Sequence, residues 1–357
     1  MRILVYGAGA VGSYLGGMLS RQGQDVTLLV RQETISLLQG RPLTIQGAGK
    51  DVVVRPELSS SLRRTLVEGA PFDLLLLGMK SYDVARALDP LVAFCPRPYP
   101  LLMTLQNGIG IEELVSEAWG ASNVVAGSLT TPVSRDIVTQ IRVERTDRGL
   151  GLAPVTPGQE MGELVALFAN AGIETKAIDD YRAMKWSKAL LNMVGNATSA
   201  IINRHPETIY RHTPTYNLEM EMLQEALAVM DAMALKVVSL PGAPARTLAF
   251  AVRHLPDLLL RPVLTRKVIA GRGNKMPSFH IDLAAGKREN EVLYHNGAVA
   301  AAGRKLGIPT PVNAALTDIL LKMARREIDW KRYDGHPDRL VRDVANYRHE
   351  PTEASAT

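Results

Sequence analysis

The sequence predicts an α/β protein in which an N-terminal doubly wound parallel sheet is followed by an all-α C-terminal domain. Short apolar runs without strict alternation, typical of buried parallel strands, alternate with helical segments in the first half. After residue 180 the apolar spacing becomes helical almost throughout. A chain of 357 residues is long enough for two domains. We therefore expect domains at 1–180 and 181–347, with a polar and disordered tail at 348–357.

The first strand, Arg2–Tyr6, leads into a glycine-rich turn, then a helix up to Gly23 and a second strand at 25–30. In such a unit one glycine makes the tight turn, one lets the backbone approach a pyrophosphate and one lets helix and strand pack closely. This context indicates a Rossmann-type dinucleotide-binding domain. A glycine-lined turn without a ligand is the alternative. The candidate cofactor-binding residues of the turn are Gly7, Ala8, Gly9, Ala10, Val11 and Gly12.

Arg31 stands at the end of the second predicted strand, where an Asp or Glu would bind the ribose 2′-hydroxyl of NAD. A guanidinium at this place suits the 2′-phosphate of NADP. The sequence therefore favours NADPH over NADH, the alternative being that Arg31 points into water.

Further strands are expected at 43–46, 51–54, 72–78, 101–105, 123–129, 140–144, 149–152 and 172–177, those at 123–129, 140–144 and 149–152 being antiparallel. Lys80 and Asn107 follow two of the apolar strands. Ligands of doubly wound sheets bind beyond the carboxyl ends of the strands. We therefore add Lys80 and Asn107 to the candidate cofactor-binding residues.

The composition, with 46% hydrophobic and 22% charged residues, is that of an ordinary globular protein. A net charge of +5 suits anionic small molecules and is too modest for a nucleic-acid partner. We expect neither a membrane span nor a signal peptide. Cys95, the single cysteine, allows no disulfide within the chain and favours a cytoplasmic protein. His280 and His295 lack metal-ligand spacing, so no metal is expected.

Lys188, Asn192 and Asn196 recur at intervals of four and share one face if residues 181–202 form one helix. Apolar residues flank them, which implies burial. Buried amides and an ammonium destabilise the fold unless they meet partners. The pattern predicts either a functional site or a satisfied structural network. Glu219, Glu221 and Glu225 are expected on a solvated helix face.

In order along residues 1–321, these motifs resemble the ketopantoate reductase (2-dehydropantoate 2-reductase) family. The matching pieces are the glycine turn, Lys80, Gln106-Asn107-Gly108, Lys188 with Asn192 and Asn196, Ser199-Ala200, the run from Ser278 to Asp282, Glu291, Asn296-Gly297 and the run from Gly307 to Pro311.

The resemblance implies NADPH-dependent reduction of 2-dehydropantoate to pantoate, in pantothenate and coenzyme A biosynthesis. Hydride would pass from the nicotinamide to the ketone carbon of this small 2-oxo acid. The resemblance makes Lys188 the general acid and gives Glu291 the task of holding it. It assigns the substrate-binding residues as Asn107, Asn192, Asn196 and Ser278. A desolvated lysine suits this chemistry, because burial lowers its pKa toward the working pH.

Three departures from the family pattern leave the oxo acid open. Asn290 precedes Glu291 where the family often has Thr, and Arg204-His205 follows Asn203 where a further substrate Asn is common. The segment 236–274 is long. It is either an extra helical hairpin for a homodimer contact or a lid that alters substrate choice. The alternatives are a paralogue reducing another 2-oxo acid and a catalytically silent NADP-binding protein.

Overall fold

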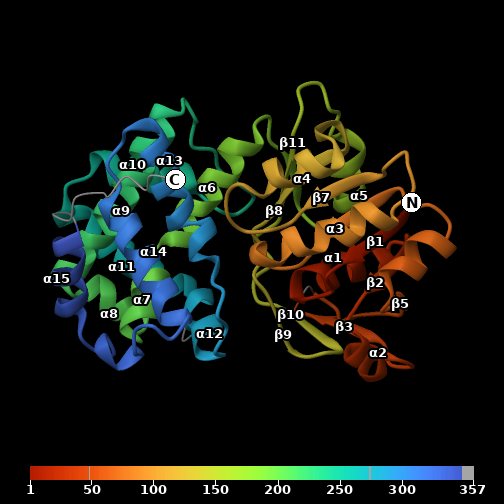
Figure 1. Cartoon of the computed structure of the whole chain (residues 1–357), viewed down its shortest axis with the longest axis horizontal. Coiled ribbons are helices and arrows are strands. Elements are labelled where there is room, and N and C mark those ends of the chain that lie inside the picture. Colours follow the sequence, from red (N-terminus) through yellow and green to blue (C-terminus); the bar gives the residue numbers. More distant parts are fainter. Residues whose placement is uncertain (48, 273–274, 348–357) are drawn as a thin grey trace. The chain divides into compact units, whose positions relative to one another are not determined.

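A computed structural model describes residues 1–47, 49–272 and 275–347; the expected disordered tail at 348–357 lies outside them. The chain divides into two compact units, residues 1–188 with 238–244 and the remainder (Figure 1). The division falls within helix α6 (Tyr181–Met193).

The first unit is built on an eight-stranded sheet in the order β12-β11-β8-β7-β6-β1-β2-β5. All neighbours pair in parallel except β8 and β11. This is the predicted doubly wound parallel sheet. Its strands are β1 (Arg2–Tyr6), β2 (Asp25–Leu29), β5 (Glu57–Ser59), β6 (Leu74–Leu77), β7 (Leu101–Thr104), β8 (Val124–Leu129), β11 (Leu150–Pro154) and β12 (Thr175–Ala177).

A second sheet, in the order β4-β3-β10-β9, completes the strands of this unit. The predicted hairpin of β3 and β4 is confirmed. The expectation of antiparallel pairing for 123–129 and 140–144 is only partly right, because β8 pairs in parallel with β7 and β10 in parallel with β3. The sequence analysis missed β5 and β9. The strands of this sheet are β3 (Leu43–Gln46), β4 (Val52–Val54), β9 (Val133–Ile137) and β10 (Gln140–Val143).

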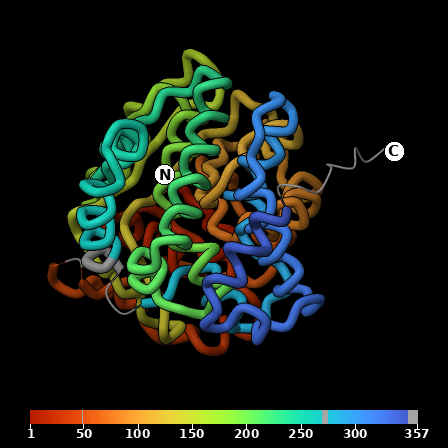
Figure 2. The backbone as a smooth tube through the Cα atoms, turned by 90° about the vertical axis from the view of Figure 1, so that its left-hand side faces the viewer, coloured from red at the N-terminus to blue at the C-terminus, as the bar shows by residue number. Residues whose placement is uncertain are grey.

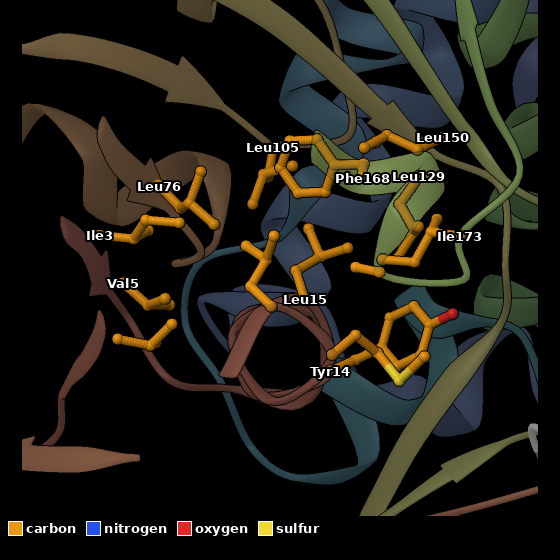
Figure 3. Packing of buried hydrophobic residues seen from close by; sticks show 14 of the residues in the cluster. Ile3, Val5, Tyr14, Leu15, Leu76, Leu105, Leu129, Leu150, Phe168 and Ile173 are labelled. Carbon is orange, nitrogen blue, oxygen red and sulfur yellow. The ribbon is translucent and has the colours of Figure 1, made fainter. Parts of the chain in front are cut away.

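The core of the first unit lies between helix α1 (Ala10–Arg21), α5 (Gly162–Asn170) and the two sheets. Tyr14 and Leu15 of α1 lie in one apolar cluster with strand residues, including Ile3 and Leu76, and with Phe168 of α5 (Figure 3). These apolar contacts fix the start of α1 against the end of β1. The remaining helices of the unit are α2 (Gln32–Leu38), η1 (Arg64–Glu68), η2 (Ser81–Asp83), α3 (Val84–Phe94), α4 (Ile111–Trp119) and η3 (Ala121–Asn123).

The second unit is helical, as predicted, and its backbone runs from green to blue in Figure 2. The single helix expected over 181–202 is wrong, because α6 ends at Met193 and α7 begins at Ala197. Gly195 adopts a positive φ of 60° at this break. Besides the end of α6, the helices of the second unit are α7 (Ala197–Ile202), α8 (Pro206–Arg211), α9 (Thr213–Ala232), α10 (Ala245–His254), α11 (Asp257–Arg272), α12 (Ser278–Ala284), η4 (Glu291–Tyr294), α13 (Asn296–Leu306), α14 (Pro311–Ala324), η5 (Trp330–Arg332) and α15 (Pro337–Tyr347).

Candidate functional site

The glycine turn between β1 and α1 has the steric character that its sequence predicts. Gly7 has a φ of 98°, and a Cβ there would lie 2.6 Å from the amide nitrogen of Met79. A Cβ at Gly12 would collide with the carbonyl oxygen of Gly7. At Gly9, by contrast, the nearest atom to an added Cβ is the carbonyl oxygen of Gly78, 3.9 Å away. Gly9 therefore leaves space in which a ligand can approach the protein backbone.

The first turn of α1 is prepared for an anion. Gly9 occupies the N-cap without a side-chain cap, and no acidic residue lies in the first turn. The amides that begin a helix are unsatisfied within it and carry partial positive charge. These residues fit the diphosphate of a dinucleotide, as the turn's sequence predicts.

The other predicted cofactor residues follow three parallel strands of the same sheet, β2, β6 and β7. Arg31 is exposed and follows β2, Lys80 is partly buried and follows β6, and Asn107 is exposed and follows β7. The hydroxyl of Ser81 donates to the carbonyl oxygen of Asn107 at 2.6 Å. Because parallel strands end at the same edge of a sheet, the structure places these residues at the edge where Gly7 also lies.

Lys185 and Glu112 form a buried ion pair that the sequence analysis missed. The Nζ of Lys185 lies 2.8 Å from a carboxylate oxygen of Glu112, and their side chains are 3% and 1% exposed. The ammonium also donates to the carbonyl oxygens of Gln106 and Gly127, at 3.0 and 2.9 Å. The hydroxyl of Thr104 donates to the same carboxylate at 2.6 Å. The pair thus ties α6 to α4, to the end of β7 and to the middle of β8.

Lys188 lies one turn further along α6 and is half-buried. Burial, and to a smaller extent the positive charges of Arg148 and Lys185, lower its pKa from 10.5 to about 8. An ammonium with this pKa exchanges its proton near neutral pH, which is what a general acid requires.

Asn196 and Ser278, predicted as substrate residues, lie together in the helical unit. The amide nitrogen of Asn196 donates to Ser278 Oγ at 3.3 Å and to the carbonyl oxygen of Asn192 at 3.0 Å. Its amide oxygen accepts from the backbone N–H of Phe279 at 3.1 Å. Asn196 therefore joins the end of α6 to the start of α12, although the two asparagines do not share one continuous helix.

Glu291 is buried at the start of η4. Asn290, the departure noted beside it, has a structural role. Its oxygen caps η4 by accepting from the N–H of Val292 at 2.9 Å, and its nitrogen donates to the carbonyl oxygen of Phe279 at 3.3 Å. The backbone of Phe279 is thus held on one side by Asn196 and on the other by the residue next to Glu291.

The expectation of a solvated helix face is wrong for Glu219 and only partly right for Glu221 and Glu225, which are half-buried. Glu219 is fully buried and accepts from Gly195 N, Thr198 Oγ1 and Tyr210 Oη. Glu225 accepts from the backbone N–H groups of Val312 and Asn313, both at 2.9 Å, at the start of α14. Glu219 therefore satisfies polar groups at the break between α6 and α7, and Glu225 satisfies the start of α14.

Metal and thiol chemistry find no support among the described residues. They contain no group of three or more His, Cys, Asp or Glu side chains that could hold a metal ion. Burial raises the pKa of the Cys95 thiol to about 11, which makes it a poor nucleophile. No helix in the described ranges is both long and apolar enough to cross a membrane.

The fold and the glycine turn define a protein of the Rossmann-type dinucleotide-binding class. The family model of ketopantoate reductase PanE/ApbA matches residues 3–150, and that of its C-terminal domain matches residues 180–324. The chain therefore belongs to the ketopantoate reductase family, as the sequence motifs predict, and is an oxidoreductase of the 2-dehydropantoate 2-reductase type.

Relatives and solved structures agree with this assignment. The 2-dehydropantoate 2-reductase of Pyrococcus horikoshii is 30% identical over 64% of this chain and 73% of its own length. That of Halobacterium salinarum is 28% identical over 92% of this chain and 100% of its own. The structure of a PanE/ApbA family ketopantoate reductase from Ralstonia eutropha JMP134 has a TM-score of 0.75 and 26% identity, covering 92% and 99% of the two chains. D-Mandelate dehydrogenase with NADH and anilino(oxo)acetate shares the fold, with a TM-score of 0.75, 20% identity and 91% and 99% coverage.

Proposed function

We propose that this chain reduces 2-dehydropantoate to pantoate with NADPH, with Lys188 as the general acid. The observation that carries the proposal is the half-buried Lys188 on α6, whose pKa is lowered to about 8 by burial and by the charges of Arg148 and Lys185. A ketone that accepts hydride becomes an alkoxide and needs a proton at once, and an ammonium with this pKa can supply it. The proposal assigns the cofactor to the domain at 1–180 and the substrate to the helical domain at 181–347.

The cofactor, when bound, supplies the hydride, and the chain's own residues bind and orient. The amides of Gly9, Ala10 and Val11 would hold the diphosphate, and Arg31 would hold the 2′-phosphate. Lys80 and Asn107 would line the nicotinamide side of the strand edge.

The substrate would be held by amides and hydroxyls rather than by further charge. Asn192, Asn196 and Ser278 can donate to and accept from the hydroxyl and carboxylate of the oxo acid, and the family resemblance assigns Asn107 to the substrate as well. Glu291 would fix the direction of the Lys188 ammonium. Positioning of this kind is the main contribution that a protein makes to a hydride transfer.

The test is turnover of 2-dehydropantoate, followed by the loss of nicotinamide absorbance, with NADPH and with NADH in parallel. We expect turnover that is faster with NADPH at subsaturating cofactor. A protein that binds NADPH and turns over no 2-oxo acid would instead be the catalytically silent alternative, which the presence of both Lys188 and Glu291 disfavours.

A paralogue acting on another 2-oxo acid is the second candidate function. The absence of a further substrate Asn after Asn203 favours it, since Arg204 there pairs with Asp334 at 2.6 Å. D-Mandelate dehydrogenase, which shares the fold, is described with NADH and anilino(oxo)acetate. A panel of aliphatic and aromatic 2-oxo acids distinguishes the two candidates by their kcat/KM values.

We propose a homodimer and a cytoplasmic location for the protein. The segment 236–274 contains α10 and α11, and α11 exposes Leu258, Leu259 and Val263. Apolar side chains grouped in this way are typical of an interface. Sedimentation equilibrium of the wild type and of a Leu258→Glu variant tests the dimer. A wild type that stays monomeric at micromolar concentration contradicts it.

A further inference from the structure

Arg135 is a cation at the glycine turn for which the sequence analysis had no role. It lies on β9, which that analysis also missed, and its guanidinium Nη1 donates to the carbonyl oxygen of Ala8 at 2.5 Å. Ala8 immediately precedes Gly9, the open N-cap of α1. The guanidinium therefore lies beside the amides that we assign to the cofactor diphosphate.

A β-bulge presents Arg135 at this place. In the pairing of β9 with β10, Ile137 lies opposite Gln140 and Ser134 lies opposite Arg142. Arg135 and Asp136 therefore share the single partner position of Ile141, a buried core residue. Bulges commonly re-aim a side chain next to a functional site.

The charge of Arg135 is not neutralised by the protein around it. Burial lowers the pKa of its guanidinium, and among the residues that the structure describes it makes no ion pair with a carboxylate. Its contact with Ala8 uses one of five N–H donors. The free-energy cost of desolvating a half-buried cation exceeds the gain from one hydrogen bond to a neutral carbonyl. An anionic ligand at Arg135 would offset the rest of that cost.

We propose that Arg135 binds the diphosphate of the dinucleotide, beside the amides at the start of α1. This inference rests on the proposed function and adds a charged ligand to the amides of the glycine turn. The diphosphate is the dianionic group that belongs to this turn, and a planar guanidinium can bind phosphate oxygens through two parallel N–H groups. Because NADPH and NADH share the diphosphate, Arg135 would serve both cofactors equally.

Cofactor binding without substrate tests this, by fluorescence titration of NADPH and of NADH. We expect Arg135→Met to raise both dissociation constants by about tenfold to a hundredfold, the range of a charge-assisted bond. Arg135→Lys, which keeps the charge and loses the planar fork, should fall between. Inorganic pyrophosphate should compete with NADPH in the wild type and much less in Arg135→Met.

The matched control is Arg142→Met, because Arg142 is an exposed arginine of the same small sheet. Its dissociation constants should stay within about twofold of the wild type. If Arg135→Met lowers the melting temperature while both constants stay within twofold, Arg135 serves only the fold and the inference is overturned. If Arg135→Met does not fold, unchanged cofactor affinity in Arg135→Lys together with no competition by pyrophosphate overturns it.

The outcomes separate this inference from the proposed function. A wild type that binds neither cofactor overturns both. A wild type that binds and turns over, with Arg135→Met binding equally well, overturns the role of Arg135 alone. If Arg135→Met binds the cofactors weakly and the wild type turns over no 2-oxo acid, the diphosphate-binding role of Arg135 is supported and the proposed reductase activity is overturned.

Discussion

Lys185 and Glu112 place opposite charges 2.8 Å apart at positions where both side chains are almost fully buried. Two further backbone carbonyls, those of Gln106 and Gly127, accept from the same ammonium. Burial of two ions is expensive, and here the cost is offset by mutual attraction and by a complete set of hydrogen bonds. The carbonyl of Gln106 belongs to the peptide that leads into Asn107, so the pair also fixes one wall of the proposed cofactor site.

Removing the cation should therefore destabilise the fold severely. We expect Lys185→Met to lower the free energy of unfolding by about 3–5 kcal/mol, because it leaves Glu112 buried without its counter-charge. Urea denaturation followed by circular dichroism measures this.

The matched control for that variant is one turn away. Arg182 and Glu113 are the neighbouring pair in sequence, but their contact is 3.4 Å and their side chains are 53% and 42% exposed. Arg182→Met should cost less than about 1 kcal/mol. The double variant Lys185→Met/Glu112→Leu should recover stability relative to Lys185→Met. Equal losses in Lys185→Met and Arg182→Met would show that the buried pair has no special role.

The sequence analysis predicted the sheet, and which residues follow its strands, better than it predicted the polar interior. Strand, glycine turn and helix are local patterns, so the positions of Gly7, Arg31 and Asn107 follow from the order of apolar runs. Ion pairs depend on contacts distant in sequence. Glu112 has the pattern of an ordinary acidic residue in the first turn of a helix, and nothing local indicates its partner, Lys185.

The same limit explains the errors in the helical unit. A spacing of four residues predicts one face of one helix, whereas Gly195 interrupts α6 before Asn196. Glu219 was assigned to solvent because charged residues are seldom buried, yet it accepts hydrogen bonds at that interruption. Gly195 and Glu219 are distant in sequence and lie on different elements. Their contact forms only when the helices pack, so no local pattern predicts it.

Substitution of Lys188 should separate activity from stability. Lys188→Met removes the proposed acid, and we expect kcat to fall by about a hundredfold or more while NADPH still binds. The folded state disfavours the ammonium, so the same variant should be more stable than the wild type at pH 7, by on the order of 1 kcal/mol. Steady-state kinetics and urea denaturation of one preparation measure both effects.

The pH dependence of that stability difference has a definite sign. Between a folded pKa of about 8 and the ordinary value of 10.5, the unfolded chain binds a proton at Lys188 that the folded chain has released. The wild type therefore gains stability as pH rises through this window, and the advantage of Lys188→Met shrinks there. A difference that stays constant from pH 7 to 10.5 would contradict the lowered pKa.

The charge of Arg148 should tune the acid. Arg148 is the largest charge contribution lowering the pKa of Lys188, after burial. If protonated Lys188 is the acid, kcat/KM of the wild type should decline above about pH 8, where the proton is lost. In Arg148→Met this decline should move to higher pH, because one repelling charge is gone. Arg142→Met, an exposed arginine without that contribution, serves as the control, and an identical displacement in both variants would rule out the specific coupling.

Arg31 should decide between the two nicotinamide cofactors, whereas Arg135 should not. Arg31 follows β2 at the strand edge and is exposed, so its charge is available to a 2′-phosphate. We expect Arg31→Ala to raise the dissociation constant for NADPH by about tenfold to a hundredfold and that for NADH by less than about twofold.

Fluorescence titrations of Arg31→Ala, Arg135→Met and the double variant form a cycle for each cofactor. Since the 2′-phosphate and the diphosphate are separate groups, the two losses for NADPH should add. Equal weakening of NADPH and NADH by Arg31→Ala would mean that Arg31 does not recognise the 2′-phosphate and that the preference for NADPH must be sought elsewhere.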